Sequence, residues 1–209
     1  MRSFLRPLWP ATDTHLLLGR PAGAPVSALP VDGVATARLS SAGDPAAAEL
    51  EAFAERQGFP EAWAHEMLAG GAEAVVARDA ATGMTLAMGW ATNRSFHVEE
   101  VEATVEPEAG GVYFFGDFVA PAARGHGLQR RLVAERLRAH DDAPYAFTLV
   151  HPSNAASVRS YENAGFAVAA AFTRSRCLGK EWVRCRPRRV GVGVAFKAIA
   201  TNRILVRRV

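Results

Sequence analysis

The stretch Phe118–His140, FVAPAARGHGLQRRLVAERLRAH, decides the fold of this 209-residue chain. A short apolar run stops at a proline and then passes an arginine and two glycines. The segment that follows carries apolar residues at helical spacing, namely Leu128, Leu132, Val133 and Leu137. Because glycines at a helix N-terminus let backbone N–H groups converge on an anion, the stretch predicts a strand, a turn suited to phosphate and a core-facing helix.

The turn differs from two common nucleotide-binding loops. No Lys-Ser or Lys-Thr pair follows Gly127, as a nucleoside triphosphate loop requires, and the third glycine of a dinucleotide-binding loop is missing. The same glycines would also serve an ordinary helix start. What the turn binds therefore has to be decided from the rest of the chain.

A second polar pattern follows the next predicted strand. Asn154, Ser157 and Tyr161 are spaced three and four residues apart, so one helix face carries an amide, a hydroxyl and a phenol. A purely structural interpretation is also open. In it Asn154 caps the helix, Ser157 is incidental, and Tyr161 packs in the core with its hydroxyl at the surface.

The remaining patterns predict an α+β fold, with a mixed sheet that carries helices on both faces. Apolar stretches bounded by turn residues predict strands over 34–40, 72–79, 84–93, 111–120 and 145–151, with a shorter one over 15–19 and a closing hairpin over 166–186. Helical spacing predicts helices over 44–58, 60–68 and 154–165, besides the one that follows the glycine turn.

Taken together, the two polar patterns resemble a known family. The motif V-x-P-x-x-R-G-x-G at Val119–Gly127, followed by N-x-x-S-x-x-x-Y-x-x-x-G-F at Asn154–Phe166, is similar to the GNAT superfamily of acyl-CoA-dependent N-acyltransferases. The resemblance covers the chain from about Val34 to Cys185. It implies a mixed, mostly antiparallel sheet in which a bulged strand splays from its neighbour and forms a V-shaped CoA cleft.

The resemblance implies that acetyl-CoA is the co-substrate. No metal is expected, because His65 and Glu66 lack the second histidine of a zinc-protease helix. The pantetheine arm would pair with the backbone of three strand residues, and the pyrophosphate would lie on the turn beside an arginine. These cofactor-binding residues are Phe118, Val119, Ala120, Arg124, Gly125, His126, Gly127, Leu128 and Gln129. Gln129 departs from the family, which usually has glycine or alanine there, and this puts the closeness of the pyrophosphate in doubt.

The helix residues also receive roles from the resemblance. Asn154 would contact pantetheine, with Ser157 on the same face of the cofactor-binding helix. Tyr161 would protonate the departing CoA thiolate. Asp117 is the candidate base or substrate anchor; the alternative is that its side chain points away from the site, since a bulge prevents strand alternation from deciding.

The implied reaction is transfer of an acetyl group from acetyl-CoA to a primary amine, by direct attack in a ternary complex. Amine attack on a thioester needs an unprotonated amine, a polarised carbonyl and a stabilised leaving thiolate. The alternative function is a non-catalytic GNAT-fold module that binds acyl-CoA or interacts with a partner.

The acceptor is expected near the first two helices and the middle strands. The second helix supplies Trp63, His65 and Glu66. Between the strands lie five carboxylates without a basic residue: Glu99, Glu100, Glu102, Glu106 and Glu108. This acidic run would attract a cationic amine, although a solvated sheet edge is the other interpretation.

The length of the chain predicts one large domain or one domain with appendages. We expect an N-terminal arm over 1–30, the GNAT domain over 31–186, and a basic extension over 187–209. The extension could add an edge strand to its own sheet or a partner's, or it could be a loosely ordered tail. A homodimer is one option for the assembly.

Composition excludes several other classes of protein. Of the 24 basic residues only Lys180 and Lys197 are lysine, which favours a GC-rich bacterial genome over a nucleic-acid patch at a net charge of +3. No apolar stretch is long enough for a signal-peptide core or a membrane span, and two cysteines make no disulfide framework. We therefore expect a cytoplasmic protein without a membrane partner.

Overall fold

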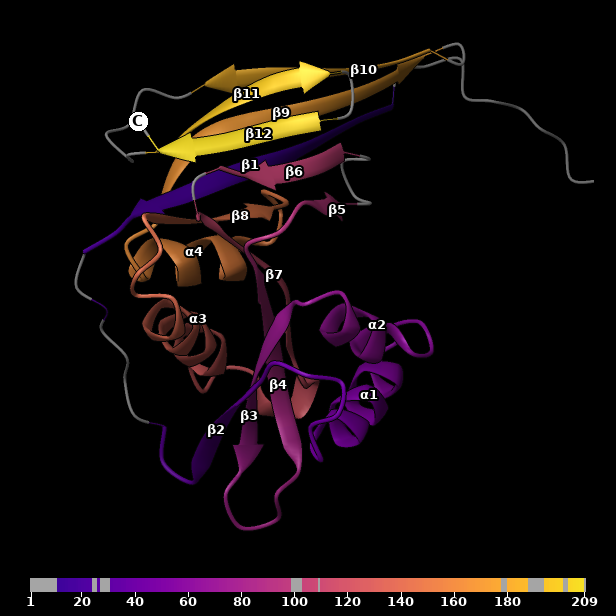
Figure 1. Cartoon of the computed structure of the whole chain (residues 1–209), viewed down its shortest axis with the longest axis vertical. Coiled ribbons are helices and arrows are strands. Elements are labelled where there is room, and N and C mark those ends of the chain that lie inside the picture. Colours follow the sequence, from indigo (N-terminus) through magenta and orange to yellow (C-terminus); the bar gives the residue numbers. More distant parts are fainter. Residues whose placement is uncertain are drawn as a thin grey trace, which may run out of the picture.

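The main sheet is mixed and mostly antiparallel. The computed structural model describes residues 11–23, 26, 31–98, 103–108, 110–177, 180–187, 194–200 and 203–208. Within them, eight strands follow one another in the order β10-β9-β1-β8-β7-β4-β3-β2 (Figure 1). All neighbouring strands are antiparallel except β7 and β8. With helices on both faces, this arrangement confirms the predicted α+β fold class.

The helices and most strands of the main sheet lie close to their predicted positions, but the first strand is longer than the predicted 15–19, and no strand was predicted over 96–98, 103–107 or 203–208. The strands of the main sheet are β1 (Ala11–Pro21), β2 (Val34–Leu39), β3 (Glu73–Asp79), β4 (Thr85–Thr92), β7 (Val112–Val119), β8 (Tyr145–Val150), β9 (Ala167–Cys177) and β10 (Lys180–Pro187). The helices are α1 (Ala47–Arg56), α2 (Trp63–Ala69), α3 (Leu128–Ala139) and α4 (Ala155–Asn163), with a 3-10 turn η2 (Pro121–Ala123). A smaller sheet has the order β11-β12-β6-β5, formed by β5 (Phe96–Val98), β6 (Ala103–Pro107), β11 (Val194–Ala200) and β12 (Arg203–Arg208).

The strand nearest the N-terminus is part of the main sheet. β1 lies between β8 and β9 and is antiparallel to both. Residues 11–21 therefore belong to the main sheet, whereas the predicted domain begins at residue 31. Their partners come from β8 and β9, which are remote in sequence, so no local pattern marks the pairing.

Two strands come from the predicted basic extension. β11 and β12 form an antiparallel pair, and β12 runs parallel to β6. Because β6 comes from the middle of the chain, β11 and β12 are joined to the domain through the smaller sheet.

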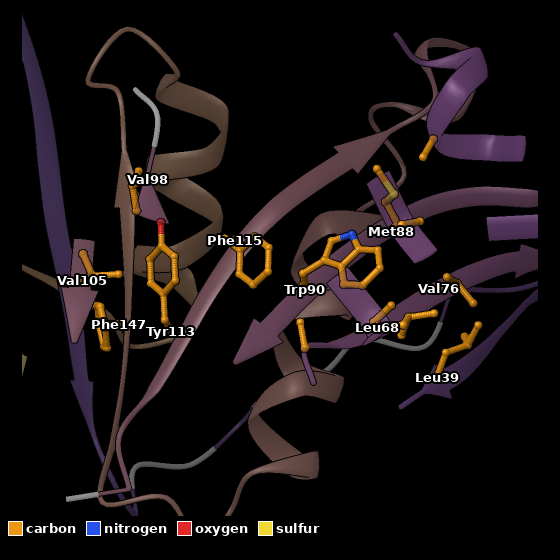
Figure 2. Packing of buried hydrophobic residues seen from close by; sticks show 14 of the residues in the cluster. Leu39, Leu68, Val76, Met88, Trp90, Val98, Val105, Tyr113, Phe115 and Phe147 are labelled. Carbon is orange, nitrogen blue, oxygen red and sulfur yellow. The ribbon is translucent and has the colours of Figure 1, made fainter. Parts of the chain in front are cut away.

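Helices α1 and α2 lie on one face of the central strands, and α3 and α4 lie on the other (Figure 1). On the face covered by α1 and α2, Trp90, Tyr113, Phe115 and Phe147 pack in one cluster with side chains from the smaller sheet (Figure 2). On the opposite face, side chains of α3 and α4 pack against β7 in a second cluster, which includes Phe114. Each fully buried side chain of this size contributes roughly 1.5–3 kcal/mol.

A β-bulge in β7 changes which side chains reach each core. The register with β4 shifts between Met88↔Phe118 and Trp90↔Phe115, so Gly116 and Asp117 both lie opposite Gly89. Gly116 has φ +59, a conformation that glycine adopts without steric cost. As a result Phe115 and Phe118 both pack on the α1/α2 side, and Asp117 turns toward α3 and α4.

Replacing Gly89 with alanine should destabilise the protein by about 2–3 kcal/mol through overpacking. A Cβ there would lie 2.6 Å from Asp117 Oδ1 and 2.9 Å from Arg136 Cζ, atoms that neighbouring groups hold in place. Urea unfolding measures the change. Gly43→Ala is the control, because its nearest atom would be Ser41 Oγ at 3.6 Å. Equal effects of the two substitutions would contradict the close approach at Gly89.

Candidate functional site

A cavity lies where β7 and β8 separate. The two strands pair only from Val112↔Ala146 to Phe114↔Thr148. Beyond this point a cavity of about 550 Å³ opens between the end of β7, the start of α3 and the start of α4. Many predicted site residues line it: Asp117, Phe118, Val119, Arg124, Gly125, Gly127, Leu128, Gln129 and Asn154. The volume is in the range typical of small-molecule and cofactor sites.

The glycine turn leads directly into α3. Gly127 is the N-cap residue and has φ +76, which places it in the left-handed region. The Arg131 N–H donates to Gly127 O at 3.1 Å, and the N–H groups of the first turn that precede it have no partner within the helix. These donors lie at the positive end of the helix dipole, which suits an anion.

Two predicted residues of the turn make local contacts. The Arg124 Nε donates to Val119 O at 3.2 Å, and its Cζ lies 5.9 Å from the centre of the Phe118 ring. The His126 ring is exposed, with Nδ1 3.4 Å from Ala123 O. The guanidinium of Arg124 is thereby held at the rim of the cavity.

The end of β7 is paired on one side only. Ala120 donates its N–H to Leu86 O at 2.9 Å, which is the side of β4. On the β8 side, pairing stops at Phe114. The edge of β7 beyond Phe114 is therefore open to a backbone-like ligand such as an amide, apart from Val119 O, which accepts from Arg124 Nε.

Asn154 is both a helix cap and a residue of the cavity lining. Its Oδ1 accepts a hydrogen bond from the Ser157 N–H at 3.1 Å, so it caps α4, and it also lines the cavity. Ser157 is buried and does not line the cavity; its Oγ accepts a hydrogen bond from Gln129 Nε2 at 2.6 Å.

A buried polar network lies behind the cavity wall. Arg136, on α3, is 0 % exposed, and its Nη2 donates to Asp117 Oδ1 at 2.5 Å. Its Nη1 donates to Trp90 O at 2.8 Å, and its Cζ lies 4.6 Å from the centre of the Phe114 ring. Asp117 Oδ2 accepts from the Tyr161 hydroxyl at 2.6 Å and from Gln129 Nε2 at 3.3 Å. Both oxygens of Asp117 are therefore engaged.

Tyr161 is fixed by the end of its helix. Gly165 follows α4 in the left-handed region, and Phe166 returns an N–H to Tyr161 O at 3.0 Å, as in a Schellman motif. The rings of Tyr161 and Phe166 pack edge to face, with 5.0 Å between their centres. The side chain is 1 % exposed, and burial raises the pKa of Tyr161 far above that of a free phenol, which Arg136 partly opposes. Its hydroxyl lies one hydrogen bond behind Asp117, which does line the cavity.

Arg136 has no predicted role in the sequence, although a signal was present. It follows Leu132 by four residues and Val133 by three, which places a charge on the apolar stripe of α3. A charge at such a position has to be paired, because burying it alone is costly.

The predicted acceptor residues lie on the other side of β7. Trp63 contacts the rings of Phe59 at 4.5 Å and Trp90 at 5.2 Å between centres. His65 and Glu66 are exposed, and the N–H of His65 donates to Glu51 Oε2 at 2.7 Å. Of the acidic run, Glu99, Glu100 and Glu102 lie outside the described residues, whereas Glu106 and Glu108 lie within them.

The described part of the chain lacks two further features. It contains no group of three or more His, Cys, Asp and Glu side chains arranged to hold a metal ion. None of its helices has the length and apolar character needed to cross a membrane.

Comparison with solved structures identifies the fold. A GCN5-related N-acetyltransferase from Sphaerobacter thermophilus aligns with a TM-score of 0.58 at 13 % identity, over 79 % of this chain and 51 % of its own. A GCN5-related N-acetyltransferase from Kribbella flavida aligns with a TM-score of 0.55 at 19 % identity, over 82 % of this chain and 61 % of its own. A putative GNAT acetyltransferase from Novosphingobium aromaticivorans aligns with a TM-score of 0.51 at 20 % identity, over 78 % of this chain and 63 % of its own. The chain has the GNAT fold.

These likenesses are structural. No family model matches the chain, and the comparison with curated proteins found no match. The chain spans between about half and 63 % of the length of the three solved structures.

Proposed function

We propose that the protein is an acyltransferase that moves an acetyl group from acetyl-CoA to a primary amine. The observation that carries the proposal is the cavity of about 550 Å³, bounded by the Gly125–Gly127 turn, the unpaired edge of β7 and α4. An anion seat at one end and a free strand edge beside it suit a molecule that has a pyrophosphate and an amide-bearing arm. Two structural neighbours are GCN5-related N-acetyltransferases, which supports an amine acceptor.

In this proposal the pyrophosphate of CoA lies on the N–H groups of the first turn of α3, with Arg124 at the rim. The pantetheine arm lies along Phe118 and Val119, beside Asn154. The acceptor approaches from the α1/α2 side of β7, and the acidic residues that follow β5 favour a cationic small molecule. We further propose that the protein acts in the cytoplasm.

The chemical step is direct attack. The amine nitrogen bonds to the thioester carbon, the carbon–sulfur bond breaks, and the sulfur takes a proton from Tyr161. The new amide nitrogen releases a proton to Asp117 or to water, from which Tyr161 is protonated again. Before the sulfur can take its proton, the Tyr161 hydroxyl has to turn from Asp117 toward the cavity.

Tyr161→Phe is expected to lower kcat about 100-fold, as loss of a general acid does, and to leave the Kd for acetyl-CoA within about twofold. The substitution keeps the ring packed on Phe166 and removes only the hydroxyl. Steady-state kinetics with free-thiol detection and calorimetric binding measure the two quantities. An unchanged kcat would remove the acid role.

Tyr145→Phe is the matched control. Its hydroxyl is also buried, donates to Glu108 O at 2.7 Å and accepts from the Glu108 N–H at 2.8 Å, and it does not line the cavity at α3. Burial raises its pKa to about 12. Losing these hydrogen bonds should cost stability without changing kcat.

One observation favours the alternative, a GNAT-fold module that binds acyl-CoA without turnover. Asp117 is paired with Arg136, and the proton of Tyr161 is already donated to Asp117, so neither group is free to act on a substrate. Free-thiol release from acetyl-CoA with a panel of amines decides between the two. Stabilisation by acetyl-CoA without amine-dependent release would establish the module.

Thermal unfolding tests the cofactor site that both functions share. At acetyl-CoA concentrations about 100-fold above Kd, the protein should gain about 2.7 kcal/mol of stability. For a chain of this size that corresponds to a rise of roughly 5–10 °C in Tm. An unshifted Tm at saturating ligand would contradict both functions.

A further inference from the structure

We propose that Ser153, His151 and Asp13 form a second site, which hydrolyses small soluble esters through an acyl group carried on Ser153. None of the three residues lines the cavity proposed for acetyl-CoA, although the next residue, Asn154, does. The hydrolysis is therefore independent of the proposed acyl transfer.

A chain of hydrogen bonds joins the three side chains. His151 Nδ1 lies 2.6 Å from Ser153 Oγ, and His151 Nε2 lies 3.2 Å from Asp13 Oδ1. The backbone N–H of Ser153 also donates to Nδ1, at 3.2 Å. Because an N–H can only donate, Nδ1 of the neutral ring carries no proton, and the proton on Nε2 is directed to Asp13. The Ser153 hydroxyl therefore donates to Nδ1, as a nucleophilic serine does to the histidine that activates it.

The fold brings these residues together from two remote parts of the chain. β1 and β8 are antiparallel neighbours, and His151 follows the last residue of β8 (Figure 1). The buried ring of His15, on β1, packs edge to face on the ring of His151 with 5.3 Å between their centres. Asp13 is two residues from His15 and so lies on the same face of β1, where its carboxylate reaches Nε2. The ring of His151 is thus held in the orientation that serves Ser153.

The serine is open to solvent and precedes a helix. The side chains of His151 and Asp13 are 45 % and 46 % exposed, and Ser153 is exposed as well. A small ester can therefore reach the hydroxyl directly. α4 begins two residues later, and the N–H groups of Ala155 and Ala156 lie in its first turn, where they have no acceptor within the helix. Such groups point back along the helix axis, toward the loop of Ser153, and suit the oxyanion that forms during attack.

The reaction takes two steps. Ser153 Oγ bonds to the carbonyl carbon of the ester and gives its proton to His151 Nδ1, while the carboxylate of Asp13 stabilises the imidazolium. The bond to the alcohol oxygen then breaks, and the alcohol takes the proton from His151. In the second step water attacks the acyl-serine and gives a proton to His151. The carboxylic acid leaves, and His151 returns the proton to Ser153 Oγ.

Hydrolysis of p-nitrophenyl acetate by the full chain, without CoA or amine, tests the site. Ser153→Ala and His151→Gln should each lower kcat at least about 100-fold, as loss of a positioned base does. The double variant should be no slower than either single one, because the two residues act as a unit. Asp13→Asn should lower kcat by a smaller factor, since asparagine cannot stabilise the imidazolium. Thermal unfolding checks that each variant is folded.

Labelling with diisopropyl fluorophosphate identifies the nucleophile independently of turnover. Ser153 Oγ should bond to phosphorus, with loss of fluoride and of the hydroxyl proton. Digestion and mass spectrometry should then locate the adduct on Ser153. His151→Gln keeps the serine but should lose the adduct, because the hydroxyl no longer has a base.

Ser41→Ala is the matched control. Ser41 is also exposed, and its Oγ accepts a hydrogen bond from the Gly43 N–H at 3.1 Å. Its loss should leave both the hydrolysis and the labelling of Ser153 unchanged. Hydrolysis by the original protein that is no faster than by Ser153→Ala, or an adduct on another residue, would overturn the inference. Because neither assay contains CoA, that result would leave the proposed acyl transfer standing.

Discussion

Arg136→Leu is expected to destabilise the protein by about 3–5 kcal/mol, as removal of one partner from a buried ion pair does. The guanidinium is 0 % exposed and donates to Asp117 Oδ1 and to Trp90 O. Leucine would leave the carboxylate of Asp117 without its cation and a backbone carbonyl without its donor. Urea unfolding of the original protein and the variant, with equal slopes, measures the loss.

Arg138 is the matched control on the same helix. It pairs with Glu135 at 2.9 Å, and its side chain is 47 % exposed. Arg138→Ala should cost less than about 1 kcal/mol, the usual value for an exposed pair. The double substitution Arg136→Leu with Asp117→Leu should recover part of the loss, because no unpaired charge is then buried. Similar costs for Arg136→Leu and Arg138→Ala would show that Asp117 does not depend on Arg136.

Gly127→Glu is expected to raise the Kd for acetyl-CoA at least about 100-fold, equivalent to about 2.7 kcal/mol. The carboxylate would occupy the N-terminus of α3, where the proposed pyrophosphate lies, and would repel it. Glutamate also has to adopt φ +76, although no atom lies within 4 Å of its Cβ position. Titration calorimetry and the shift of Tm with acetyl-CoA measure the effect.

Gly23→Glu separates backbone strain from the loss of the anion site. Gly23 also has φ +76 and open space around the Cβ position, and it lies near the other end of α3, beside Leu137 and His140. It should lower Tm to a similar degree as Gly127→Glu and leave acetyl-CoA binding unchanged. If Gly127→Glu still binds acetyl-CoA with the original Kd, the turn is not the pyrophosphate site.

The turn and its helix could be predicted because their signals are local. The glycines, the preceding proline and the apolar spacing of α3 all lie within Phe118–His140, and the observed helix begins at Leu128 as expected. The polar face of α4 was equally visible, since Asn154, Ser157 and Tyr161 are neighbours on one helix. What these side chains contact was not visible, because their partners come from other elements.

The sequence could not predict which face of the sheet the Asp117 side chain occupies. Its position on a strand allowed either face, and the bulge that decides between them needs Gly89 on β4 opposite Gly116 and Asp117 on β7. Arg136 was missed for a related reason. A charge on an apolar helix face is acceptable only if a partner exists, and that partner is a carboxylate which the bulge has turned inward.

The sequence by itself determined the order of the helices and of the main-sheet strands, the glycine turn and the face that carries the polar residues of α4, because neighbours along the chain control these features. Only the tertiary structure decided that β1 lies between β8 and β9, that Asp117 pairs with Arg136, and that Gln129 reaches Ser157. Each of these depends on strand register or on packing between residues remote in sequence, where the cost of an unpaired buried group selects one arrangement.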